Sequence, residues 1–360
     1  MSIDKRPNGR WRARWREADG KQRARHFDRK VDADRFLTTI KNAQLVGTYV
    51  DPAKGKVTLA SYAAEWFERM KPTWRDATAT LVESNLRNHI KPSSLGVRPI
   101  GQIRRTDVEA WAAALTLAPG TVATVRQHLG QVLQGAVEDG LIPRNPCLGA
   151  RLPRAEEKRA KPIDPKVLEK IAVAAPAWFA VAIPIGLGLG LRQGEACGLT
   201  VDRVDFLRRV VRIDRQRITS PGGVNTLEAP KTASSFRTIP LPTFVADALS
   251  THIATHGVGD HGVLLHDQGA MLARNRFGDV WRSIRVGDEH YHDLRHTFAS
   301  TLLSAGVSVK AVADWLGHAN PAITLSTYAH LMPVDEDRAR TVLDGAFRAA
   351  EDSVRTAAGG

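Results

Sequence analysis

The 360-residue sequence predicts a multidomain protein with a small N-terminal β-sheet-plus-helix domain, an all-α helical domain and a mixed, mainly-α α+β domain. Three observations support this: an alternating stretch near the N-terminus, then helical periodicity alone, then helical periodicity mixed with short strand patterns. The predicted boundaries are 1–56, 57–150, a charged, proline-containing linker at 151–165, and 166–360.

Residues 9–27 alternate as the two faces of a β-strand do, and Asp19-Gly20 predicts a hairpin turn. Trp11, Ala13 and Trp15 fall on one face. The candidate DNA-binding residues of this hairpin are Arg12, Arg14 and Arg16 on the other face, with Arg23 and Arg25 on the returning strand. We therefore expect one arginine-rich sheet face.

A helix is predicted to follow this hairpin. Asp32 is its expected N-cap, and its apolar face is formed by Phe36, Leu37, Ile40 and Ala43.

The charge balance points to a polyanionic partner. Lys and Arg number 51 against 38 Asp and Glu, which gives a net charge of +13. Residues 1–56 hold 15 basic and 7 acidic residues, so more than half of the excess lies there. A solvated strand face is the ordinary explanation, but few acids neutralise these arginines, and guanidinium groups suit phosphate and groove contacts.

Residues 58–148 predict four helices near 58–70, 76–90, 106–115 and 119–139, the last ending at Gly140 before PRNPC. The candidate DNA-binding residues of this domain are Arg87, Lys91 and Arg126.

Several classes of protein are excluded. No run approaches the ~20 apolar residues of a membrane helix, and the charged N-terminus lacks a signal core, so we expect a cytoplasmic, nucleoid-associated protein and no membrane partner. Cys147 and Cys197 have no metal-ligand spacing. A P-loop and a carboxylate cluster for magnesium are both missing from the sequence, so we expect no cofactor and no metal.

The third domain predicts helices near 165–182 and 193–199, strands near 209–214 and 236–240, and then helices to the end. Four short segments within it carry reactive residue types: GLGLRQGEACGL, EAPKTASSFRTIPL, HDLRHTFAS and WLGHANPAITLSTYAH. Each alone has an ordinary structural explanation, such as a helix-surface ion pair, a solvated lysine or a packed tyrosine.

In this order and spacing, the segments resemble the catalytic signature of the tyrosine recombinases, the phage integrase family. Arg192 and Glu195 match its R-x-x-E/D pattern, Lys231 its hairpin lysine, and HDLR, with His292 and Arg295, its H-x-x-R box. His318 follows LG, and Tyr328 comes ten residues later, one more than in many members.

The resemblance is strong over residues 160–345. It is looser over 58–148, which resembles the core-binding domain through LRNHIKPSSLGVRPIGQI, while residues 1–56 resemble the arm-type DNA-binding domain of lambda-like integrases.

The resemblance implies that Tyr328 attacks a phosphate of double-stranded DNA at an attachment site and forms a 3′-phosphotyrosine. Arg192 and Arg295 would clamp the phosphate, and Lys231 would protonate the leaving 5′ oxygen. His292 would assist proton transfer, His318 would hydrogen-bond the phosphate, and Glu195 would orient the site.

The resemblance also implies an assembly. A homotetramer would act through a Holliday junction, with a C-terminal segment exchanged between protomers. A host DNA-bending protein and an excisionase are further expected partners.

The residue types fit this chemistry independently, because a tyrosine ester conserves bond energy and two arginines supply permanent, forked charge for a phosphate. The predicted function is therefore a phage or prophage integrase. The alternatives are a transposon or chromosomal recombinase, a non-catalytic DNA-binding regulator on the same scaffold, and a type IB topoisomerase.

Overall fold

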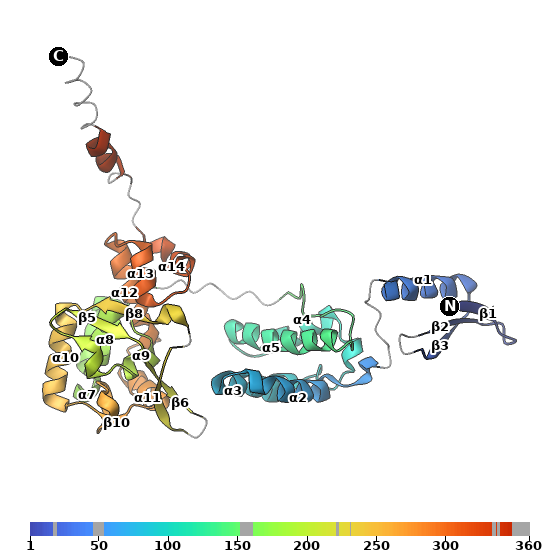
Figure 1. Cartoon of the computed structure of the whole chain (residues 1–360), viewed down its shortest axis with the longest axis horizontal. Coiled ribbons are helices and arrows are strands. Elements are labelled where there is room, and N and C mark those ends of the chain that lie inside the picture. Colours follow the sequence, from blue (N-terminus) through green and yellow to red (C-terminus); the bar gives the residue numbers. More distant parts are fainter. Residues whose placement is uncertain are drawn as a thin grey trace, which may run out of the picture. The chain divides into compact units, whose positions relative to one another are not determined.

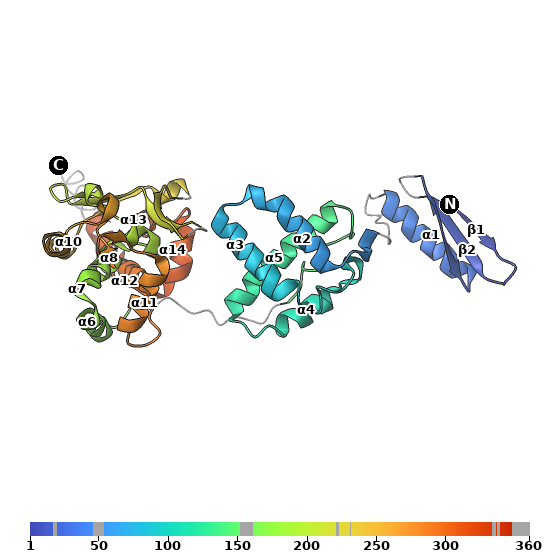
Figure 2. The same ribbon diagram turned by 90° about the horizontal axis from the view of Figure 1, so that it is seen from below.

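The computed structural model describes residues 1–16, 20–45, 54–151, 161–220, 223–230, 232–332, 336 and 339–347. The chain forms two compact units, Met1–Glu156 and Glu157–Gly360, and the division falls within the predicted linker (Figures 1 and 2). Within the first unit, the N-terminal module and the helical domain have separate hydrophobic cores. The predicted multidomain fold class is confirmed. None of the described helices is both long and apolar enough to cross a membrane.

The N-terminal module is a three-stranded antiparallel sheet covered by one helix (Figure 1). Its elements are β1 (Ser2–Lys5), β2 (Trp11–Arg16), β3 (Gln22–Phe27) and α1 (Lys30–Leu45). The predicted hairpin is β2–β3, and β1 adds an edge that the alternation did not reveal. Asp19 lies outside the described residues, as does the side chain of Ala43.

The predicted cap of α1 is wrong by one turn. The helix begins at Lys30, and Asp32 lies in its first turn, where a carboxylate favours the positive end of the helix dipole.

The prediction of a single arginine face is also wrong. Arg23 pairs with Trp15, and Arg25 pairs with Ala13. Because directly opposed residues of antiparallel strands share a face, Arg23 and Arg25 lie on the side that carries the packed Trp15 and Ala13. Arg12, Arg14 and Arg16 occupy the other, open side. The physical reason is the pairing register between β2 and β3. The alternation of side chains within one strand does not determine which residues of the next strand they face.

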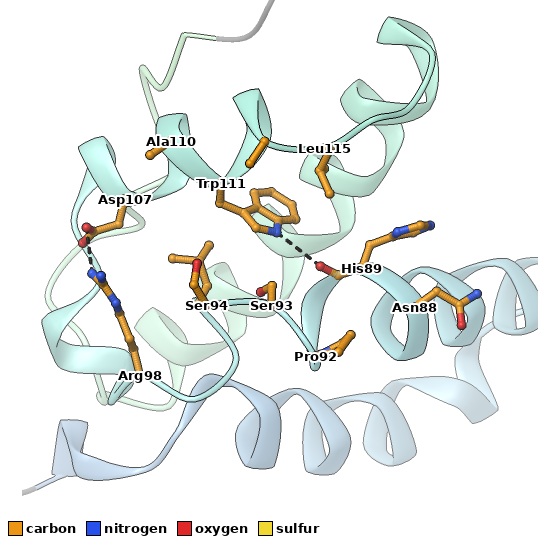
Figure 3. A pocket seen from close by; sticks show the side chains of 12 residues that line it. Asn88, His89, Pro92, Ser93, Ser94, Arg98, Asp107, Ala110, Trp111 and Leu115 are labelled. Carbon is orange, nitrogen blue, oxygen red and sulfur yellow. Dashed lines mark hydrogen bonds and ion pairs between the residues drawn. The ribbon is translucent and has the colours of Figure 1, made fainter.

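The helical domain contains the four predicted helices. They are α2 (Leu59–Met70), α3 (Asp76–Asn85) with a π-helical continuation (Leu86–Ile90), α4 (Arg105–Ala113) and α5 (Pro119–Glu138). Thr58 caps α2, because its hydroxyl accepts from the Ser61 amide. A hollow of about 420 Å³ lies between the end of the π-helical turn and α4, beside Trp111, whose indole donates to the His89 carbonyl at 3.2 Å (Figure 3).

The second unit is mainly helical. Its helices are α6 (Pro165–Ala174), α7 (Ala177–Ala180), α8 (Ala182–Leu189), α9 (Gln193–Cys197), α10 (Thr243–His256), α11 (Arg274–Ile284), α12 (Tyr291–Ser304), α13 (Val309–Leu316) and α14 (Pro321–Tyr328). The predicted helix 165–182 is broken into shorter helices, because Pro176 cannot continue α6.

Three small sheets complete the described part of this unit. One has the order β4 (Val204–Asp205), β5 (Val210–Ile213), β8 (Arg237–Pro240); the others are the hairpins β6 (Gln216–Thr219) with β7 (Asn225–Glu228) and β9 (His266–Asp267) with β10 (Ala270–Met271). β5 and β8 confirm the predicted strands, whereas both hairpins escaped the sequence pattern.

The buried helix α8 is the centre of this unit and packs against α12 and α10. A Cβ atom on Gly186 would lie 2.8 Å from Leu294 Cβ, an atom that cannot rotate away, so only glycine allows α12 to approach this closely. Gly190, with φ of 60°, ends α8 in the left-handed conformation. The chain then turns directly into the segment that contains Arg192.

Candidate active site

Arg192 and Glu195 are joined at the start of α9. The backbone amide of Arg192 donates to Glu195 Oε2 at 2.9 Å, and Arg192 Nη1 donates to Oε1 at 3.0 Å. The Arg192 side chain remains 39% exposed, whereas that of Glu195 is 3% exposed. Glu195 therefore fixes the position of Arg192 from the buried side. The solvent-exposed part of the Arg192 guanidinium remains accessible to a ligand.

Glu195 also binds a second arginine. Arg237, the first residue of β8, donates from Nη1 and Nη2 to the two carboxylate oxygens at 3.0 and 2.9 Å, and its Nε donates to the Trp315 carbonyl at 2.6 Å. Burial raises the pKa of Glu195, but Arg237 and Arg192 together lower it further, to about 2. The carboxylate is ionised and orients both cations.

Arg237 escaped the sequence reading, although it lies in the segment EAPKTASSFRTIPL from which only Lys231 was selected. The available signal was an arginine at the start of a predicted strand. Lys231 itself lies outside the described residues, so its role stays a prediction.

Arg295 is 2% exposed on α12. Its Nη1 donates to the Gly190 carbonyl at 2.7 Å, and its Nη2 to the Leu316 carbonyl and, at 3.2 Å, to His318 Nε2. Burial and the charge of Arg192 lower the pKa of Arg295 to about 9. A buried cation whose hydrogen bonds end on carbonyls and an imidazole favours an anionic ligand.

The proton of His318 can be assigned from its partners. Arginine only donates, so His318 Nε2 accepts from Arg295, and the ring proton lies on Nδ1, which donates to Thr324 Oγ1 at 2.8 Å. Burial and Arg295 lower the pKa of His318 to about 4. The ring is therefore neutral at pH 7 and is held by the fully buried Thr324.

His292 lies three residues before Arg295 on the same face of α12 and has an exposed edge. Partial burial of the His292 ring lowers its pKa to about 4, and the nearby His296 and Arg295 add to this effect. Its ring centroid lies 4.8 Å from that of His296.

Tyr328 ends α14, and its side chain is buried, with 2% of the residue exposed. Its hydroxyl lies 2.7 Å from His296 Nδ1. Burial raises the pKa of Tyr328 to about 12. His296 was not selected from the sequence, although it follows His292 by four residues and so shares its helix face.

The candidate DNA-binding residues are dispersed. Arg12 and Arg14 both pair with Asp4, at 2.9 and 3.3 Å, which neutralises part of the open sheet face. Arg16 and Arg25 are exposed, and Arg23 is half-buried.

In the helical domain, Arg87 is exposed and Lys91 half-buried. Arg126 is half-buried and donates to the Cys147 carbonyl at 3.3 Å, an ordinary structural role.

The second unit thus brings α9, β8, α12 and α14 together around three arginines, a buried carboxylate, neutral imidazoles and a phenol. The phage integrase family model matches residues 162–333, the phage integrase central domain 59–152, and the phage integrase N-terminal domain 2–45. The chain belongs to the phage integrase family of tyrosine recombinases. It is a site-specific DNA recombinase.

Relatives agree with this assignment over most of the chain. A XerC-like tyrosine recombinase of Caldanaerobacter subterraneus is 28% identical, with 81% of this chain and 84% of the relative covered. A putative prophage phiRv2 integrase of Mycobacterium tuberculosis is 27% identical over 90% of this chain and 89% of its own length.

A similar solved structure is that of the Tn1549 transposon integrase in complex with circular intermediate DNA. It is 25% identical, with 79% of this chain and 98% of that chain covered and a TM-score of 0.69.

Proposed function

We propose that this recombinase integrates the DNA of a phage or prophage, and that Tyr328 cuts each strand by forming a 3′-phosphotyrosine and releasing a 5′-hydroxyl. The observation that carries the proposal is the environment of Arg295, whose buried guanidinium is bound by two carbonyls and a neutral imidazole beside the half-exposed Arg192. A phosphodiester would supply an anion to Arg295 and to the exposed edge of Arg192.

The remaining residues take the roles that the family resemblance implies. Arg192 and Arg295 clamp the non-bridging oxygens, where forked donors are most effective. Glu195 orients Arg192. His318 hydrogen-bonds the phosphate once its ring proton lies on Nε2, because a phosphate oxygen only accepts. His292 assists proton transfer, and Lys231 protonates the leaving oxygen.

The proposed assembly on DNA also follows from the family resemblance. Four protomers act on two duplexes through a Holliday junction, in the bacterial cytoplasm and on the nucleoid. Ile323 and Leu325 on α14 are each about half exposed, and residues 339–347 are helical and exposed; both fit an exchanged C-terminal segment. A host DNA-bending protein and an excisionase would set the direction of recombination.

A transposon integrase is the second candidate, favoured by the similarity to the Tn1549 integrase. The sequence flanking the gene separates the two, because a phage that inserts in a tRNA gene leaves a direct repeat at the far end of the element.

The chemistry is tested with a nicked suicide substrate that carries the end of the element. Wild type should become covalently linked to DNA, whereas Tyr328→Phe should bind and form no adduct. An adduct with Tyr328→Phe would move the nucleophile elsewhere.

Two other outcomes identify the rejected alternatives. Binding without an adduct by wild type would indicate a regulator. Relaxation of a plasmid that lacks the element's ends would indicate a topoisomerase.

A further inference from the structure

The Tyr328 hydroxyl has a defined partner on α12. Its oxygen lies 2.7 Å from His296 Nδ1, and the two ring centroids are 5.7 Å apart. The Tyr328 ring belongs to the apolar cluster that includes Phe298 and Leu316. The phenol is therefore fixed on two sides, by packing around the ring and by one hydrogen bond at the oxygen that must attack.

The protonation states of Tyr328 and His296 follow from their environments. Burial raises the pKa of Tyr328 to about 12. Burial lowers the pKa of His296 below its usual value, and of the nearby charges Asp293 opposes this and Arg295 adds to it. Both groups are thus neutral at neutral pH, and the phenol donates to His296 Nδ1 when the imidazole carries its own proton on Nε2.

The helix α12 places His296 beside the proposed phosphate site. His292, Arg295 and His296 lie within one helical turn and share a face. Arg295 is a cation and cannot accept a proton. The ring centroid of His292 lies 4.8 Å from that of His296. Of these three side chains, His296 is the one hydrogen-bonded to the nucleophile.

We propose that His296 is a further catalytic residue of this recombinase, the general base that takes the Tyr328 proton during strand cleavage. This inference rests on the proposed function, in which Tyr328 is the nucleophile. The Oη–H bond breaks and an Nδ1–H bond forms at His296, while the Oη–P bond forms and the P–O5′ bond breaks. The leaving 5′ oxygen takes its proton from the acid, assigned above to Lys231.

The same arrangement serves religation. The attacking 5′-hydroxyl gives its proton back to the residue that served as the acid, assigned above to Lys231, while its O5′–P bond forms. The Oη–P bond breaks, and the imidazolium of His296 returns its proton to Oη. Burial and the neighbouring Arg295 make a charged His296 unfavourable. His296 therefore keeps the tyrosine proton only as long as Tyr328 is bonded to the phosphate. No metal or external co-reactant is needed for this balance.

The test compares His296→Asn with wild type in single-turnover cleavage of the suicide substrate across neutral and alkaline pH. Asparagine can accept the Tyr328 hydrogen bond but cannot take its proton. We expect unchanged DNA affinity and a cleavage rate lower by about 10²–10⁴-fold, the usual contribution of a general base. The rate of the variant should rise with pH, whereas that of wild type is level at neutral pH and falls in acid.

The control is His290→Asn, at the exposed N-cap of α12, a position where asparagine is well suited. It should cleave as wild type does. His296→Ala provides a second variant, and added imidazole should restore part of its cleavage rate by acting as an external base.

The results of the cleavage assay distinguish failure of this inference from failure of the proposed function. Equal rates and equal pH profiles for His296→Asn and wild type would overturn the inference while leaving the proposed function intact. Faster cleavage by His296→Asn would also overturn it and identify the hydrogen bond as a restraint on Tyr328. A wild type that forms no adduct would instead refute the proposed function.

Discussion

Glu195 and Arg237 form a doubly hydrogen-bonded ion pair, at 3.0 and 2.9 Å, across 42 residues of sequence. Both side chains are nearly fully buried, at 3% and 5% exposure. The pair joins the start of β8 to the arginine at the start of α9. It makes the geometry of Arg192 depend on a residue that the family signature, as read from the sequence, does not include.

Arg237→Met should destabilise the protein, because it leaves the Glu195 carboxylate buried with one cation fewer. Breaking a buried pair by removing one partner costs about 3–5 kcal/mol, which urea denaturation monitored by circular dichroism would measure. Arg282→Met is the matched control, because Arg282 pairs with Asp279 on the exposed surface and should lose at most about 1 kcal/mol. Equal losses would show that the buried pair has no special role.

Arg192→Lys and Arg295→Lys should each lower the single-turnover cleavage rate by about 10²–10³-fold. Lysine keeps the charge but loses the fork, so at position 295 it cannot bind the Gly190 carbonyl and His318 as the arginine does. Arg276→Lys, at an exposed pair with Asp267, is the control. Wild-type cleavage by Arg192→Lys would reduce Arg192 to a structural partner of Glu195.

Thr324→Val should disturb His318 without changing side-chain shape. The substitution leaves the Nδ1 proton of a neutral ring without an acceptor, at a cost of about 1–3 kcal/mol, and so favours the other tautomer. The ¹⁵N chemical shifts of His318 report this change directly, and cleavage should slow because the ring loses the hydrogen bond that fixes its orientation. Thr324→Ser retains the hydroxyl and should restore both. An unchanged His318 spectrum in Thr324→Val would contradict the assignment.

Acid should destabilise the protein in two stages. The folded pKa values of His292 and His318, each about 4, lie below the usual 6.5, so the unfolded chain binds more protons as pH falls from 6.5 to 4. Glu195, at about 2 against 4.5, extends the loss further into acid. These three groups therefore make their full contribution to stability only above about pH 6.5.

Urea midpoints across this range would show the decline. His318→Asn should decline less steeply than wild type between neutral pH and about pH 5. His261→Asn is the control, at an exposed site whose positive φ of 57° suits asparagine. Parallel slopes for all three proteins would argue against a neutral, half-buried His318.

The parts that the sequence could predict are those encoded locally. Arg192 with Glu195 and His292 with Arg295 are three apart on single helices, and periodicity alone defined the helices of the first unit. Arg237 acts through Glu195, which is 42 residues away in the sequence, and Thr324 binds His318 across the turn between α13 and α14. Patterns within single segments reveal neither contact. His296 was visible in HDLRH, but only its contact with Tyr328 distinguishes it from a packed histidine.

The N-terminal module should bind a DNA sequence distinct from the cleavage site. Residues 1–56 carry a net charge of +8, and a tethered module gains affinity only when its own site lies within reach. Protein that begins at residue 57 should bind and cleave the core site but fail to integrate a substrate that needs outer sites. Footprints that cover the same bases with and without the module would reduce it to a nonspecific electrostatic anchor.

The register of β2 and β3 sharpens this prediction, because it divides the arginines between two faces. Arg16 is exposed on the open face, whereas the Arg25 guanidinium lies 5.4 and 5.2 Å from the rings of Phe27 and Phe36. If the open face reads bases, Arg16→Ala should lose about 1–3 kcal/mol on the specific sequence and little on random DNA. Arg25→Ala should mainly lower the melting temperature of the module. Equal, sequence-independent losses of DNA affinity in both variants would mean that the arginines contact phosphates only, since such contacts carry no sequence information.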